Sequence, residues 1–224
     1  MESQGLDPSL FEVPASPVYN PDDKSNPDWV QKEMADNKPS TLISIDPGFA
    51  NLGYAKAEYT LDPHKKAINL HFTQLGTHRI SDDPKGSIPE FTERVASFFN
   101  RAFPSDNELK SCCVLIEQQY NKPAPTASPG QRFFFNQLQV LYTALHSYAS
   151  GKNCFVDTVH PNSVKALFKT KGLDYNSNKE AAMNFCRTKL QISTADSHQS
   201  DAILQACCWL QSNFPDYALN VSSC

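Results

Sequence analysis

Three strand-like segments follow one another closely near the start of the apolar part of this sequence, and they constrain the fold more than any other feature. Residues 41–46 are apolar and rich in β-branched side chains, and the run stops at Pro47-Gly48. Residues 52–60 and 67–75 alternate apolar and polar side chains, which is typical of half-buried strands. Because the connections between the three segments are short, we expect an antiparallel meander.

Helices and single strands alternate after this meander. Helical spacing of apolar residues covers residues 88–103, 133–149, 178–190 and 197–213, and short apolar runs at 112–117 and 154–159 indicate strands. Pro161 follows the second run and is suited to open a further helix. A meander followed by alternating helices and strands predicts an α/β fold with a mixed five-stranded sheet flanked by helices.

The 224 residues divide into a main domain and two tails. Residues 1–38 are rich in Pro, Asp, Asn and Ser, with apolar residues only scattered singly, so we expect a disordered N-terminal tail. We expect one domain over residues 39–215 and a short C-terminal tail over residues 216–224. Apolar residues make up 40% of the chain, and no run reaches the roughly 18 residues that a membrane span requires.

The acidic charge is concentrated in the predicted N-terminal tail. The chain has a net charge of −4, and residues 1–38 contain eight acids against three bases. The remainder has 17 bases against 16 acids, and residues 162–190 alone contain six bases and two acids. This local excess of positive charge is suited to follow a phosphate backbone.

The cysteines indicate a reducing environment. Seven are present, two pairs of them adjacent in sequence, and there is no CxxC motif. An odd number of cysteines within apolar segments predicts buried free thiols. The N-terminus has neither a secretory nor a transit-peptide pattern, so we expect an intracellular location.

Acidic side chains lie at structural boundaries in three separate places. Asp46 ends the first strand, and Gly48 and Gly53 leave the backbone free on either side of the following turn. Glu117 ends a buried apolar run, where a charge is costly unless something binds it. His198 and Asp201 are three residues apart at the start of the last helix, so they share a face.

Such a set of residues suits phosphodiester hydrolysis. Two divalent metal ions about 4 Å apart activate water and stabilise the leaving oxygen, and they need hard oxygen ligands from several elements. Taken singly, each residue has an ordinary structural explanation: a turn, an edge carboxylate, or a charge near the helix dipole. Their joint occurrence at the ends of successive elements favours a metal site.

Three segments in the same order resemble the motifs of the RuvC-type Holliday-junction resolvases. They read LISIDPG over residues 42–48, followed by Gly53-Tyr54, then IEQQY over residues 116–120 and HQSDA over residues 198–202. The resemblance spans roughly residues 40–210 and extends to the mitochondrial and large-DNA-virus branches of this superfamily. It implies an RNase H-like fold.

The resemblance also implies a function and a set of site residues. The implied metal ligands are Asp46, Glu117, His198 and Asp201. Lys165 and Lys179 match family lysines, the first of them near the scissile phosphate, and Tyr120 matches an aromatic that enters the junction centre. The implied activity is a Mg²⁺-dependent endonuclease with two ions per site, for which Mn²⁺ would substitute. A homodimer would make paired symmetric nicks in four-way DNA, in recombination and repair.

Several alternatives remain open at the level of sequence. In one alternative, the protein is a nuclease that acts on RNA or another branched nucleic acid. In another, it is a catalytically inactive junction-binding protein. Asp196 is an alternative to His198 as the ligand in the closing motif. We expect Asp196 instead to cap the last helix, because it lies five residues before Asp201 and outside the helix.

Overall fold

The computed structural model of the chain describes residues 40–48, 50–80, 88–103, 112–119, 126–152, 154–169 and 172–224. The predicted N-terminal tail over residues 1–38 and Tyr120 lie outside these ranges. Within them, the strands are β1 (Ser40–Pro47), β2 (Asn51–Asp62), β3 (Ala67–Arg79), β4 (Cys112–Glu117), β5 (Phe155–Val159) and β6 (Ala218–Ser223). The helices are α2 (Ile88–Ala102), α4 (Pro129–Gly151), α5 (Pro161–Leu167), α6 (Tyr175–Phe185), the π-helical turn η2 (Cys186–Leu190) and α7 (Ser197–Asn213).

One mixed sheet organises these elements, with the strand order β5-β4-β1-β2-β3-β6. The predicted meander is confirmed, since β1, β2 and β3 pair antiparallel in succession. Strand β4 then pairs in parallel with β1, and β5 pairs in parallel with β4. The sheet therefore changes at β1 from the parallel pairs β5-β4 and β4-β1 to the antiparallel pairs β1-β2 and β2-β3.

The prediction of five strands was wrong, because the described part of the chain forms six. The additional strand, β6, pairs in parallel with β3 and lies in the segment that we expected to be a C-terminal tail over residues 216–224. Its sequence, ALNVSS, has only Leu219 fully buried. A short edge strand of this kind carries too little apolar alternation to be recognised.

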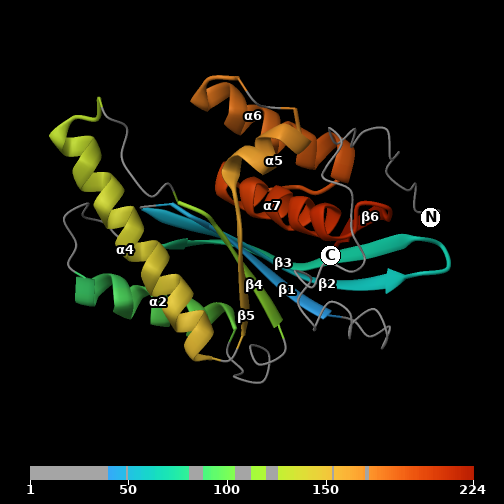
Figure 1. Cartoon of the computed structure of the whole chain (residues 1–224), viewed down its shortest axis with the longest axis horizontal. Coiled ribbons are helices and arrows are strands. Elements are labelled where there is room, and N and C mark those ends of the chain that lie inside the picture. The colour runs from blue at the N-terminus through green and yellow to red at the C-terminus, as the bar shows by residue number, and fades with distance from the viewer. Residues whose placement is uncertain are drawn as a thin grey trace, which may run out of the picture.

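Helices cover both faces of the sheet and create two hydrophobic cores. Helices α5, α6 and α7 lie on one face, and α2 and α4 lie on the other (Figure 1). Strand β1 contributes to both cores, with Leu42 packed on the side of α7 and Ile43 and Ile45 on the side of α2 and α4. Burial on both faces explains why this strand is apolar without alternation.

No helix in the described ranges is long and apolar enough to cross a membrane. All seven cysteines are thiols outside any disulfide, and the five that are buried are Cys112, Cys113, Cys186, Cys207 and Cys208. Cys154 is half-buried and Cys224 is exposed, so burial of the thiols is less complete than we predicted.

Candidate active site

Two of the predicted acidic residues meet because their strands are parallel neighbours. Ile45 of β1 is paired with Ile116 of β4, so Asp46 and Glu117 both follow this pair at the carboxyl ends of adjacent strands. Asp46 is only 7% exposed, and Glu117 is half-buried. This edge lies beside the point where the sheet changes from parallel to antiparallel, a common position for sites in α/β proteins.

Helix α7 brings the third acidic residue to this edge by packing closely on the turn between β1 and β2. A Cβ atom added to Gly53 would lie 2.3 Å from the backbone oxygen of His198, and one added to Gly48 would lie 2.9 Å from the imidazole Cε1 of that residue. Neither glycine has a positive φ. Glycine is thus needed for close approach, rather than for the backbone freedom that the sequence suggested.

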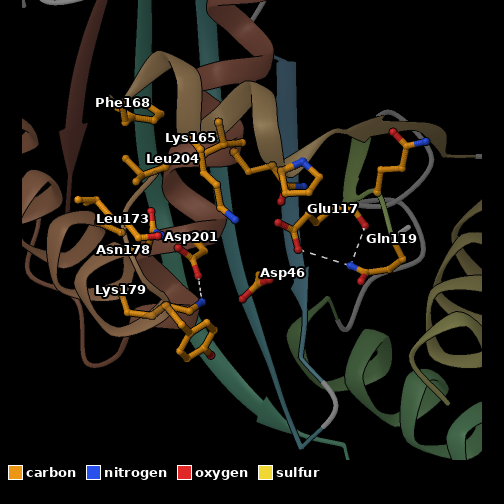
Figure 2. Close-up of a pocket in the computed structure, with 16 residues that line it drawn as sticks. Asp46, Glu117, Gln119, Lys165, Phe168, Leu173, Asn178, Lys179, Asp201 and Leu204 are labelled. Carbon is orange, nitrogen blue, oxygen red and sulfur yellow. Dashed lines mark hydrogen bonds and ion pairs between the residues drawn. The ribbon is translucent and has the colours of Figure 1, made fainter. Parts of the chain in front are cut away.

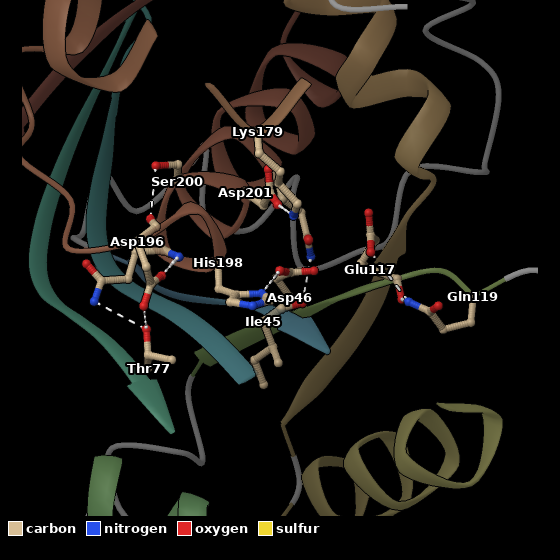
Figure 3. Close-up of polar contacts among 12 residues, drawn as sticks. Ile45, Asp46, Thr77, Glu117, Gln119, Lys179, Asp196, His198, Ser200 and Asp201 are labelled. Carbon is tan, nitrogen blue, oxygen red and sulfur yellow. Dashed lines mark hydrogen bonds and ion pairs between the residues drawn. The ribbon is translucent and has the colours of Figure 1, made fainter. Parts of the chain in front are cut away.

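Two polar contacts connect α7 with the strands and with α6. Nδ1 of His198 donates a hydrogen bond to Oδ2 of Asp46 over 2.9 Å, and the ammonium group of Lys179 forms an ion pair with Asp201. Figure 3 shows Asp46 beside the ring of His198, with the Lys179–Asp201 pair and Glu117 nearby. The four predicted ligands therefore come from β1, β4 and α7 to one place.

The carboxylates line a cavity of about 430 Å³. Asp46, Glu117 and Asp201 all line it, and Lys165 and Lys179 reach it from α5 and α6 (Figure 2). His198 is not among the residues that line this cavity, because its ring is turned toward Asp46. The structure thus brings both predicted lysines to the predicted carboxylates.

The carboxylates repel one another in this setting. Burial raises the pKa of Glu117 to about 8, with further contributions from the charges of Asp46 and Asp201. Burial and the charge of Asp46 raise the pKa of Asp201 to about 6. Glu117 and Asp201 therefore keep their protons to a higher pH than ordinary carboxyl groups do, and such raised pKa values are common at functional sites.

The basic groups respond to the same charges. The hydrogen bond to Asp46 raises the pKa of His198. Burial alone would lower the pKa of Lys179, but the carboxylates of Asp201 and Asp46 outweigh it, so the pKa of the lysine is raised. Lys179 thus remains a cation among the carboxylates.

Asp196 lies apart from the cavity and caps α7, as we predicted. Its Oδ1 accepts a hydrogen bond from the backbone N–H of Gln199 over 3.0 Å, and its Oδ2 accepts one from the hydroxyl of Thr77 over 2.6 Å. Both carboxylate oxygens are therefore engaged outside the cavity, whereas His198 contacts Asp46 directly.

Sequence reasoning did not single out Gln119 or Tyr175. The amide of Gln119 donates to the carboxylate of Glu117 over 3.4 Å, and Tyr175 lines the cavity from the start of α6. Gln119 could have been found from its position, two residues beyond Glu117 in the second motif. No periodicity or motif marks Tyr175.

The donor chemistry fits a hard divalent cation, since three carboxylates and an imidazole face one another. Among the described residues, no group of three or more His, Cys, Asp and Glu side chains is already arranged around a common ion position. Three of the four predicted ligands are engaged in polar pairs instead, Asp46 with His198 and Asp201 with Lys179. Metal binding would therefore require these side chains to rearrange.

No protein-family model matches the chain, and no curated protein sequence matches it. Solved structures do match. RuvC of Thermus thermophilus has a TM-score of 0.51 and 17% identity, covering 80% of this chain and 98% of that chain. The same protein in complex with a Holliday junction substrate has a TM-score of 0.50 and 16% identity, with the same coverage. The yeast mitochondrial Holliday junction resolvase Ydc2 has a TM-score of 0.46 and 15% identity, covering 85% of this chain and 88% of that chain. The two RuvC matches, together with the mixed sheet flanked by helices, show that the chain has the RuvC-type, RNase H-like fold that its three motifs predicted.

Proposed function

We propose that this protein is a metal-dependent endonuclease that resolves four-way DNA junctions by paired symmetric nicks. One observation carries the proposal: Asp46, Glu117 and Asp201, from three separate elements, share one cavity with two lysines. The fold adds support, because one solved structure that shares it is a RuvC in complex with a Holliday junction substrate.

Asp46, Glu117, Asp201 and His198 would hold two Mg²⁺ ions, with Mn²⁺ as a substitute. When bound, such ions activate a water and stabilise the leaving oxygen of a phosphodiester. The protein's own contribution is to hold the carboxylates on rigid elements. The end of β1 and the end of β4 are fixed by sheet pairing, and the start of α7 is fixed by its contact with Gly53.

Two lysines supply positive charge for the phosphate. Lys165 lies on α5, and its side chain points toward the carboxylates (Figure 2). Lys179 contacts Asp201 from α6. A phosphate that enters the cavity would meet both ammonium groups, which would orient it and stabilise charge that develops on its oxygens.

Paired symmetric cuts require two sites, so we propose a homodimer with twofold symmetry. Tyr120 follows Glu117 by three residues, and its proposed role is to enter the centre of the junction. Loss of its ring in Tyr120→Ala should therefore weaken cleavage more than binding, and Tyr120→Phe should be tolerated.

The test is to incubate the purified protein with a labelled four-way junction, a linear duplex and an RNA–DNA hybrid, in Mg²⁺, Mn²⁺ or EDTA. We expect cutting of the junction alone, in either metal and not in EDTA. Asp46→Asn, Glu117→Gln and Asp201→Asn should each abolish cutting and keep junction binding. Glu58→Gln, at an exposed position on β2, is the matched control.

The same experiment separates the alternatives. Preferential cutting of the RNA–DNA hybrid would show that the substrate contains RNA and is not a four-way DNA junction. Tight junction binding with no cutting in either metal would identify an inactive binding protein. Near-normal cleavage by any one of the three carboxylate variants would remove that residue from the proposed metal site.

A further inference from the structure

Part of the cavity lining is apolar, although carboxylates and lysines line the same cavity. At its rim are Leu173 and Tyr175, which are 46% and 72% exposed. Deeper residues of this apolar part are Val164, Phe168 and Leu204. Figure 2 shows Phe168, Leu173 and Leu204 on the side of the cavity away from Glu117 and Gln119.

The turn that presents Leu173 and Tyr175 is held rigidly. Asp174, between them, caps α6 by accepting hydrogen bonds from the backbone N–H groups of Asn176 and Ser177, over 3.0 and 3.1 Å. The amide of Asn178 donates to the carbonyl oxygens of Leu173 and Asp174, over 2.8 and 2.9 Å. These hydrogen bonds therefore hold the backbone that carries the exposed side chains of Leu173 and Tyr175.

Tyr175 also lies beside the polar part of the cavity. The ammonium of Lys179 is 5.6 Å from the centre of the Tyr175 ring, and the same ammonium contacts Asp201. A flat aromatic surface thus adjoins the position proposed for the phosphate. The cavity, at about 430 Å³, is within the range of sites that enclose a small organic ligand, so a nucleotide fits better than a phosphate alone.

We propose that Tyr175, together with Leu173 and Phe168 of the same cavity lining, forms a subsite for a nucleobase next to the scissile phosphate. This inference rests on the proposed function. A base is joined to its phosphate through one sugar, so a base and a phosphate from the same nucleotide would occupy the apolar and polar parts of the cavity together. Within a duplex, both faces of a base are covered by neighbouring bases, so the subsite takes the base of an unstacked nucleotide.

This arrangement would make the cavity selective for the nucleotide at a branch point. Stacking of a base on an aromatic side chain does not depend on the identity of the base, because every base has a π face. Tyr175 would therefore select for an accessible base and for strand geometry, while leaving sequence preference to other contacts.

The experiment compares Tyr175→Ala and Tyr175→Phe with the wild type. Substrates are an intact four-way junction and junctions with a single abasic site on either side of the mapped cleavage position. We expect Tyr175→Ala to lower kcat/KM roughly tenfold on the intact junction, since base–aromatic stacking contributes about that much. Of the two abasic junctions, the one that lacks the base bound by Tyr175 should be cut poorly by the wild type. Tyr175→Ala should cut this junction no worse than the wild type does. Tyr175→Phe should retain wild-type behaviour.

Met183→Ala is the control variant. Met183 is 36% exposed on the same helix but lines a different cavity, with Ser177, Arg187 and Thr194. This substitution should change neither kcat nor KM. A second readout, which needs no cleavage, is 2-aminopurine placed beside the scissile phosphate and bound in EDTA: the wild type and Tyr175→Phe should quench its fluorescence, and Tyr175→Ala should not.

Two results would overturn the subsite. Equal losses for Tyr175→Ala on intact and abasic junctions would mean that the ring only positions Lys179. A Tyr175→Phe variant as impaired as Tyr175→Ala would mean that the hydroxyl acts, not the ring. If the wild type cuts no junction, the proposed function fails. The 2-aminopurine, placed in turn at each nucleotide of the branch point, then decides on the subsite alone: quenching that depends on the Tyr175 ring at one of these positions supports the subsite, and its absence at all of them rejects it.

Discussion

Glu117→Gln should stabilise the metal-free protein at alkaline pH while abolishing its activity. The pKa of Glu117 is raised from its ordinary value of 4.5 to about 8 by burial and by the charges of Asp46 and Asp201. At 1.36 kcal/mol per pH unit, this corresponds to roughly 5 kcal/mol. Since Glu117 is half-buried, solvent screening reduces the effect, and we expect about 1–2 kcal/mol.

The direction of this effect follows from proton linkage. Between pH 4.5 and about 8, the folded protein keeps a proton on Glu117 that the unfolded chain has released. The stability contributed by this group is therefore fully present below pH 4.5 and falls as the pH rises toward 8. Glutamine cannot ionise, so the variant does not lose this contribution.

The assay is chemical denaturation in EDTA from pH 5 to 9. The wild type and Glu117→Gln should have similar unfolding free energies at pH 5, and the variant should be the more stable at pH 8. Added Mg²⁺ should raise the stability of the wild type more than that of the variant at pH 8. Glu58→Gln controls for the loss of one negative charge on the exposed part of β2. Parallel pH profiles for the wild type and Glu117→Gln, or a less stable variant at pH 8, would refute the reasoning.

Three further predictions concern the start of α7. Gly53→Ala should cost at least about 2 kcal/mol of unfolding free energy, because the added Cβ would lie 2.3 Å from the backbone of His198. The control is Gly151→Ala, whose Cβ would meet nothing within 4 Å. It should be neutral or slightly stabilising in the same denaturation assay. Asp196→Ala should cost about 1 kcal/mol through the lost cap and leave most cleavage activity, and a stable but inactive variant would assign the ligand role to Asp196. His198→Ala should lose most activity in Mg²⁺, and His198→Asp should restore much of it; equal activity of the two in a cleavage assay would contradict a ligand role for residue 198.

Much of the fold could be predicted because its central elements carry strong local signals. Strand β1 is apolar on both faces and ends at Pro47-Gly48, and the predicted and observed ranges agree for β4 and α7. Strand β6 gave no such signal, because its stability comes from pairing with β3, some 150 positions away in the chain. Local patterns report local preferences, and pairing across that separation is a tertiary effect.

The candidate site, too, could be predicted only in part from the sequence. Asp46, Glu117 and Asp201 could be found because each stands at the end or the start of an element and belongs to a motif. Their meeting depends on the parallel pairing of β1 with β4, which the sequence allowed but did not require. Tyr175 could not be found, since its significance lies only in its distance from Lys179 and in the cavity that the two line.

The two polar pairs at the site explain how three carboxylates can be held together in the metal-free fold. Asp46 is neutralised in part by His198, and Asp201 by Lys179, while Glu117 is held with a raised pKa. Each acid thus has a different means of limiting repulsion: a hydrogen bond from an imidazole, an ion pair, or retention of a proton. All three are reversible, since a histidine and a lysine side chain can rotate and a carboxyl group can ionise. A scaffold that fixes the backbone of β1, β4 and α7 while leaving these side chains exchangeable would keep the three carboxylates together and still offer hard oxygen donors.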